Sequence, residues 1–306
     1  MPRHWPKLLV HRFSCAILFP ALILASLGTV GIARAQNLVP DNSVAPEDMV
    51  DVDLQLVLAV DVSASIDAEE GRLQRDGYVK AIIDPLVIQA IQAGPNGRIA
   101  VAYTEWSGPL HQRVVVDWRI IDGPESALEF AELLDQAPIL TGRRTSISGA
   151  IQHAVAIFHK AKRFRATRKV IDISGDGPNN GGFYVHQTRF RAFENGITIN
   201  GLPIHNDRPS PLGIPATPNI DLYYEDCVIG GPGAFIVVAE TLGSFAAAVR
   251  RKLILEIAGL QLPPRDRRQE PAESGIVPAQ LAVGLTDCTI GERQYDLFRQ
   301  RQNLKN

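Results

Sequence analysis

The sequence predicts an α/β fold: a doubly wound, mostly parallel central sheet with helices on both faces and one antiparallel edge strand. Two observations carry this prediction. Short apolar runs alternate with longer segments whose apolar residues recur at helical spacing, as at 99–104 and 68–93. The run 55–60 is almost purely apolar, which is typical of a parallel strand buried on both faces. Strands that alternate with helices of this length form such layered sheets.

The expected elements follow this alternation along the chain. Residues 112–117 alternate in hydrophobicity like a strand, and the helix at 68–93 should stop at the Gly-Pro-Asn-Gly segment 94–97. We expect strands at 55–60, 99–104, 112–117, 169–174, 197–202 and 234–238, and helices at 68–93, 126–134, 146–162, 185–194 and 242–257.

The first 35 residues have the features of a signal peptide. Arg3, Lys7 and Arg12 form a basic opening, an apolar stretch follows at 13–32, and small residues at 33 and 35 suit signal peptidase. We expect cleavage after Ala35, a periplasmic or secreted protein, and no stable membrane span after cleavage. The alternative is an uncleaved membrane anchor, because the apolar stretch is long enough to span a bilayer.

The remaining chain is expected to hold one domain with extensions. Residues 36–52 are polar and contain proline, which predicts a linker; 53–258 form the α/β domain, and 259–306 form a C-terminal extension. The 306-residue chain is 45% hydrophobic with a net charge of −2, typical of a globular protein. It has no basic bias of the kind that nucleic-acid binding requires.

Two cysteines, Cys227 and Cys288, remain after the predicted cleavage, because Cys15 lies in the signal peptide. In an oxidising compartment they would form one disulfide that closes a loop of about 60 residues. Two independent buried thiols are the alternative, since spacing alone does not decide between them.

The chemistry of the chain is concentrated directly after the first strand. Asp61, Ser63 and Ser65 follow the apolar run 55–60, at the carboxyl end of the strand, where open α/β sheets bind their ligands. A carboxylate and two hydroxyls at alternate positions can converge on one cation. Oxygen ligands of this kind suit Mg²⁺, and also Mn²⁺ or Ca²⁺.

Two further polar residues are expected at the same edge of the sheet. Thr145 opens the helix at 146–162, and Asp176 follows the strand at 169–174. Each has a structural alternative, because threonine commonly caps a helix and Asp-Gly-Pro commonly forms a turn. Together with Asp61, Ser63 and Ser65 they nevertheless predict a metal site. Glu105, after the second strand, is a weaker additional acidic candidate.

These five residues resemble the metal-ion-dependent adhesion site of von Willebrand factor A domains, over residues 53–257. The resemblance implies that Ser63, Ser65 and Thr145 bind the cation directly, that Asp61 and Asp176 bind directly or through water, and that a partner's carboxylate completes the shell. The segments 103–108, 145–150 and 226–235 more narrowly resemble DUF1194, an exported bacterial family of uncharacterised function. The resemblance thus implies an exported, metal-dependent adhesion module that binds an unknown protein.

An enzyme is not expected, because no complete catalytic constellation is found. The histidines lack the His-Glu-x-x-His spacing of zinc hydrolases, and no Gly-x-Ser-x-Gly elbow occurs. The best enzymatic alternative is a Mg²⁺-dependent phosphatase-like hydrolase with Asp61 as its nucleophile. That alternative lacks a second carboxylate two residues after Asp61 and a general acid, since Lys169 starts its strand and so lies at the opposite edge.

Overall fold

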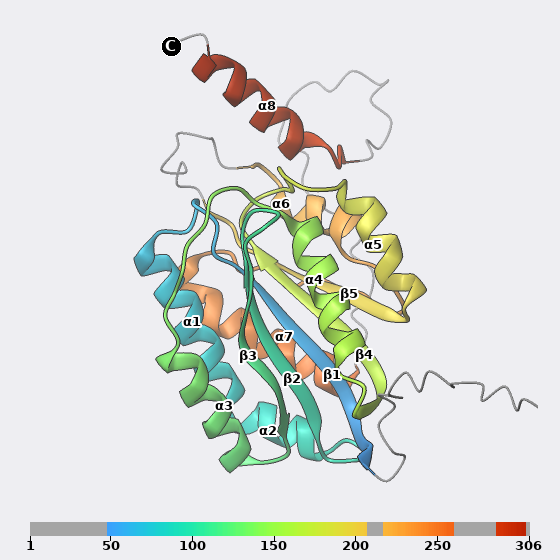
Figure 1. Cartoon of the computed structure of the whole chain (residues 1–306). Coiled ribbons are helices and arrows are strands. Elements are labelled where there is room, and N and C mark those ends of the chain that lie inside the picture. Colours follow the sequence, from blue (N-terminus) through green and yellow to red (C-terminus); the bar gives the residue numbers. More distant parts are fainter. Residues whose placement is uncertain (1–47, 207–216, 260–285, 304–306) are drawn as a thin grey trace, which may run out of the picture. The chain divides into compact units, whose positions relative to one another are not determined.

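The sheet of the computed structural model confirms the predicted fold class (Figure 1). The structure describes residues 48–206, 217–259 and 286–303; the predicted signal peptide and residues 36–47 of the predicted linker lie outside them. Within them, five strands run in the order β3-β2-β1-β4-β5, parallel except for the antiparallel edge strand β3. The strands are β1 (Val50–Asp61), β2 (Ile99–Trp106), β3 (Gln112–Ile121), β4 (Phe164–Gly175) and β5 (Ile197–Pro203).

Helices cover both faces of this sheet. One face carries a layer in which α1 packs against α3 and α7, and α2 packs against α7, while α4 and α5 pack together on the other face (Figure 1). The helices of the first layer are α1 (Ala68–Ile82), α2 (Pro85–Gln92), α3 (Pro124–Gln136) and α7 (Phe245–Ala258). Those of the second are α4 (Ile147–Lys160) and α5 (Val185–Glu194).

The central strand β1 shows why the predicted run is almost purely apolar. Leu56 and Leu58 belong to the core on the α1 and α7 side, whereas Val57 and Ala59 belong to the core that α4 completes. Successive side chains of a strand point to opposite faces. From Leu56 to Val60 the strand is therefore apolar at every position, and the next polar residue is Asp61, at the edge of the sheet.

Two expected elements are wrong in detail. The single helix at 68–93 is two helices, because Asp84 caps α2 through the N–H of Leu86 and Pro85 occupies its first position. The segment 234–238 is no strand of the sheet: Ile236 forms an isolated bridge to Gly201 of β5, and Ala239 forms another to Ile204, directly after β5. The N–H of Phe235 donates instead to the side chain of Asn200, at 3.1 Å.

The chain after β5 contains elements that the periodicity did not predict. A short α6 (Ile220–Tyr223) continues as a π-helix (Tyr224–Val228), the 3-10 turn Leu242–Ser244 precedes α7, and α8 (Ile290–Asn303) lies in the predicted extension. Cys227 and Cys288 form a disulfide, which decides between the two alternatives. Disulfides are typical of oxidising compartments. The described helices include none with the length and apolar character that crossing a membrane requires.

Candidate metal site

The candidate site lies at the carboxyl end of the central strand of the sheet. β1 is central, with β2 on one side and β4 on the other, so its carboxyl end is the point at which the strand order reverses. Asp61 is the last residue of β1, and Asp176 directly follows β4. The topology therefore brings together two carboxylates that are more than a hundred residues apart in the sequence.

A chain of hydrogen bonds joins four of the five predicted residues. Asp61 Oδ1 accepts from the N–H of Ser63 at 2.7 Å, and the hydroxyls of Ser63 and Ser65 lie 3.0 Å apart. Ser65 Oγ then donates to Asp176 Oδ1 at 2.7 Å. Oxygen atoms from two separate loops thus converge within hydrogen-bonding distance.

Thr145, the fifth residue, lies on a third loop beside the other two. Gly142 forms a bridge with Ser63, and its N–H donates to the carbonyl of Val62 at 2.9 Å, which fixes the loop against the end of β1. A Cβ placed on Gly177 would be 3.8 Å from Thr145 Oγ1, so the hydroxyl lies next to the residue that follows Asp176. The structure thus brings all five predicted residues to one edge of the sheet.

Burial dominates the electrostatics of the two carboxylates. Asp61 is fully buried, and burial raises its pKa well above the usual range, with a further contribution from the charge of Asp176. Burial also raises the pKa of Asp176, against the lowering effect of hydrogen bonds from Ser65 and Asn206. Asp61 Oδ2 is buried and has no hydrogen-bond partner in the described part of the chain. Such an atom is costly unless a ligand satisfies it.

The donor set fits a hard divalent cation. Two carboxylates can balance its charge, and the hydroxyls of Ser63, Ser65 and Thr145 are neutral oxygen ligands of the type that Mg²⁺, Mn²⁺ and Ca²⁺ accept. Nowhere in residues 48–206, 217–259 and 286–303 do three His, Cys, Asp or Glu side chains gather as in a zinc site. A cation at this position would also favour the ionised form of both aspartates.

Close backbone approach is required beneath Asp61. A Cβ on Gly175 would lie 2.8 Å from Tyr224 Oη and 2.9 Å from Asp61 Oδ2. Glycine at this position therefore lets the tyrosine hydroxyl and the carboxylate share one buried space. Burial raises the pKa of Tyr224 well above its usual value, so the phenol stays protonated beside Asp61.

Glu105 does not belong to the site. Its carboxylate is buried and pairs with Arg75 and with Arg113, the latter at 2.5 Å. Arg75 Nη1 also donates to the carbonyls of Leu134 and Ala137, at 2.6 and 2.9 Å. The interpretation of Glu105 as an additional acidic neighbour of the metal is therefore replaced by a structural role, which ties β2 and α1 to the end of α3.

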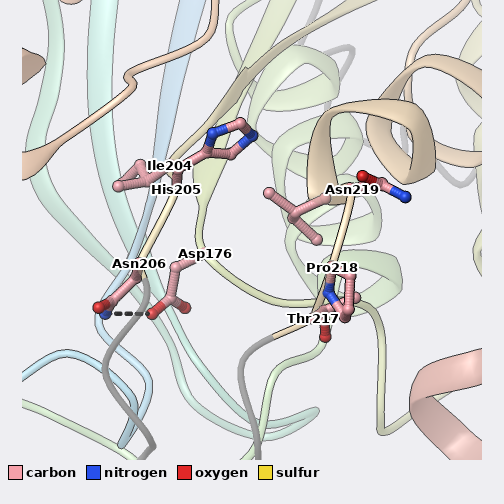
Figure 2. Close-up of a pocket in the computed structure, with 8 residues that line it drawn as sticks. Asp176, Ile204, His205, Asn206, Thr217, Pro218 and Asn219 are labelled. Atoms are coloured by element: carbon pink, nitrogen blue, oxygen red, sulfur yellow. Dashed lines mark hydrogen bonds between the residues drawn. The ribbon is translucent and has the colours of Figure 1, made fainter. Parts of the chain in front are cut away.

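Asn206 was missed by the sequence reasoning. Its Nδ2 donates to Asp176 Oδ2 at 3.1 Å, and both residues line a cavity of about 280 Å³ (Figure 2). Asn206 closely follows the apolar strand β5, so a polar residue after a third parallel strand was the signal that could have found it. The remaining lining comes from Ile204, His205, Thr217, Pro218, Asn219 and Ile220.

The family comparison agrees with the narrower of the two resemblances. The family model described as a protein of unknown function, DUF1194, matches residues 51–261. The chain belongs to the DUF1194 family. The match extends from β1 to the end of α7 and so includes the five candidate residues and Asn206. No curated protein matches the chain.

Solved structures similar to this DUF1194 member include three proteins of low sequence identity. Proximal thread matrix protein 1 from mussel byssus, with a zinc-occupied MIDAS motif, is 15% identical (TM-score 0.47; 69% of this chain and 49% of that one). A von Willebrand factor type A protein from Catenulispora acidiphila is 14% identical (0.46; 67% and 43%). The vWF domain of the type V pili tip protein Mfa5 from Porphyromonas gingivalis is 10% identical (0.45; 71% and 99%). The chain thus spans under half the length of the first two.

Proposed function

We propose that the protein is an exported binding module in which a divalent cation, most favourably Mg²⁺, bridges the site to a carboxylate on a partner protein. The observation that carries the proposal is the buried, unpartnered Asp61 Oδ2, at the end of the hydrogen-bonded chain through Ser63 and Ser65 to Asp176. A cation would satisfy this oxygen and offset the repulsion between the two aspartates.

The number of available ligands favours an acidic partner. Ser63, Ser65 and Thr145 supply neutral oxygens, and Asp61 and Asp176 supply the only two formal charges among these five residues. Mg²⁺ prefers six oxygen ligands and usually keeps several waters, so positions remain open to exchange. An anionic oxygen from another molecule would replace one of those waters.

The geometry supports binding better than phosphoester hydrolysis. A hydrolase would need a general acid or a phosphate-binding cation close to Asp61. Lys169 pairs in register with Gln55, near the middle of β1, whereas Asp61 ends that strand six positions further on. Lys169 does not start its strand as expected, because β4 begins at Phe164. Its register nevertheless places it six positions short of Asp61, so the hydrolase is not proposed.

Metal titration of the purified, oxidised protein tests the proposal. We expect Mn²⁺ to bind with one-site stoichiometry by calorimetry and by loss of the free-ion electron paramagnetic resonance signal. Asp61→Asn and Ser63→Ala should each abolish or strongly weaken that binding. Asp135→Asn, which changes an exposed carboxylate on α3, is the matched control and should bind normally.

Partner binding requires a second measurement. Cross-linking in Mg²⁺ should capture the partner with the natural protein and with Asp135→Asn. It should not capture the partner with Ser63→Ala, or when EDTA is added before the cross-linker. The absence of Mn²⁺ binding to the natural protein would overturn the metal site. Turnover of generic phosphoesters that disappears in Asp61→Ala would instead overturn the assignment as a binding module.

A further inference from the structure

The C-terminal helix α8 packs directly against the loop that follows Asp176. A Cβ on Gly291 would lie 2.2 Å from the carbonyl oxygen of Asn179, so the first turn of α8 rests on that backbone. Glu292 Oε1 accepts a hydrogen bond from Asn179 Nδ2 at 2.8 Å. Asn179 is itself fully buried, and its Oδ1 accepts from the N–H of Ser148 in α4 at 3.0 Å. The contact thus connects α8 to the loop of Asp176 and to the start of α4.

A second contact joins α8 to the residue before Thr145. The guanidinium of Arg144 lies over the ring of Tyr295, 4.2 Å from its centroid. Arg144 has a left-handed backbone with φ 75°, a conformation that costs energy for any residue with a side chain. Its Nη2 also donates to the carbonyl of Asn180 at 2.9 Å. These contacts hold a strained residue in place.

The loops that α8 contacts are also joined to each other at Thr145. The N–H of Thr145 donates to Asn180 Oδ1 at 2.8 Å, and the N–H of Asn180 donates to the carbonyl of Thr145 at 2.7 Å. Thr145 is therefore clamped by Asn180. Tyr295 and Glu292 hold the residues on either side of this clamp, Arg144 and Asn179.

The disulfide fixes the start of α8. Cys288 lies two residues before the helix, and its partner Cys227 is fully buried in the π-helix that begins at Tyr224. In the adjoining α6, Tyr223 Oη accepts from the N–H of Asn179 at 3.1 Å. The covalent link therefore anchors α8 to a segment that itself supports the loop of Asp176.

We infer that α8 is a positioning element of the metal site: Tyr295 and Glu292 hold Arg144 and Asn179, and so hold Thr145 and the Asp176 loop, in the geometry that binds the cation. The inference rests on the proposed function. Residues that orient metal ligands commonly change metal affinity about 10- to 100-fold when mutated. Tyr295 and Glu292 act one step further from the cation, so each should have a smaller effect.

The test measures Mn²⁺ affinity in single variants of α8 within the complete, oxidised chain. Tyr295→Ala removes the aromatic face and should weaken Mn²⁺ binding about two- to fivefold, as expected for a cation–π contact of this exposure. Tyr295→Phe keeps that face and should restore the affinity. Glu292→Ala should weaken binding to a similar extent, whereas Glu292→Gln keeps a side-chain acceptor and should bind normally. Leu297→Ala changes an exposed residue of the same helix and is the matched control.

Hydrogen exchange of the metal-free protein gives a readout that does not depend on metal binding. In Tyr295→Ala and Glu292→Ala, the amides of Thr145 and Asn180 should exchange faster than in the natural protein and in Leu297→Ala. Unchanged exchange and unchanged Mn²⁺ affinity in both alanine variants would overturn the inference and leave the metal site intact. Faster exchange in a protein that binds no Mn²⁺ would confirm the hold of α8 on the loops while overturning the proposed function.

Discussion

Two buried polar clusters lie at different depths along the same strand, and they differ in where their positive charge comes from. At Asp172, in β4, Lys252 Nζ lies 2.7 Å from the carboxylate and also pairs with Glu256. At the end of the strand, Asp176 and Asp61 are joined through serine hydroxyls. The first cluster carries its own cation on α7. The second has oxygen ligands arranged for a cation from solution.

The source of the positive charge distinguishes a buried ion-pair cluster that stabilises the fold from a cluster that is available to bind a ligand. Glu256 Oε1 accepts from Asn200 Nδ2 at 2.9 Å, and Lys252, Glu256 and Asp172 are almost wholly buried, so the inner cluster is closed to solvent. The outer cluster has no basic side chain among the hydrogen-bond partners that the described residues supply, and it lies beside the cavity at Asp176. Four predictions, in order of decreasing expected effect, test this contrast.

Removal of the inner cation should have the largest effect. Lys252→Met leaves the buried carboxylates of Asp172 and Glu256 without their partner, which typically costs about 3–5 kcal/mol. Denaturant unfolding should show this loss, whereas Lys80→Met, at an exposed position of α1, should be near neutral. A Lys252→Met protein as stable as the natural one would contradict the role of Lys252 as the cation that stabilises the two buried carboxylates.

Metal addition should stabilise the protein through the outer cluster alone. A ligand at 100 times its Kd adds about 2.7 kcal/mol to the free energy of unfolding. For a domain of this size that corresponds to a rise in Tm of about 5–10 °C. Calorimetry with Mg²⁺ and with EDTA should show the rise in the natural protein and in Asp172→Asn, but not in Ser63→Ala. A rise retained in Ser63→Ala would place the ion elsewhere.

The inner cluster should make stability depend on pH. Burial and the charge of Glu256 raise the pKa of Asp172 to about 7, although Lys252 opposes the shift. The folded protein therefore keeps a proton that the unfolded chain releases near pH 4, so this contribution to stability is present at acidic pH and is lost as the pH rises through about 7. Relative to the natural protein, Asp172→Asn should gain stability across this range. If the free energy of unfolding of the natural protein and of Asp172→Asn changed with pH in parallel, the raised pKa of Asp172 would be contradicted.

The smallest effect is expected at Asn206. Its amide orients Asp176 through one hydrogen bond, so Asn206→Ala should weaken Mn²⁺ binding about threefold without loss of stability. Calorimetric titration measures this, with Asn195→Ala, at an exposed position after α5, as control. Equal affinities would show that Ser65 alone orients the carboxylate.

The residues whose position at the edge of the sheet could be predicted from the sequence are those that adjoin one regular element. Asp61, Ser63 and Ser65 lie at or directly after the end of a strand buried on both faces, and open α/β sheets bind their ligands at the carboxyl ends of their strands. Thr145 and Asp176 could be placed in the same way, because each adjoins one regular element. Their positions at one edge follow from topology; their role as metal ligands remains a prediction.

The residues that were missed depend on contacts between distant segments. Glu105 pairs with Arg75 and Arg113 across three elements, and nothing in its own neighbourhood predicts those partners. Lys252 directly follows two exposed arginines, Arg250 and Arg251, and only the packing of α7 on β4 shows that it is buried. The predicted strand at 234–238 is reduced to isolated bridges, and the N–H of Phe235 donates to the side chain of Asn200 rather than to a neighbouring strand.

Arg144 illustrates a conflict between stability and site geometry. Glycine adopts φ 75° without steric cost, so Arg144→Gly would relieve local strain and would look favourable to any procedure that optimises the fold alone. The same change would remove the guanidinium that spans Asn180 and Tyr295. Engineering of this domain for thermal stability should therefore leave position 144 unchanged, because the gain in stability would come with a loss of cation affinity.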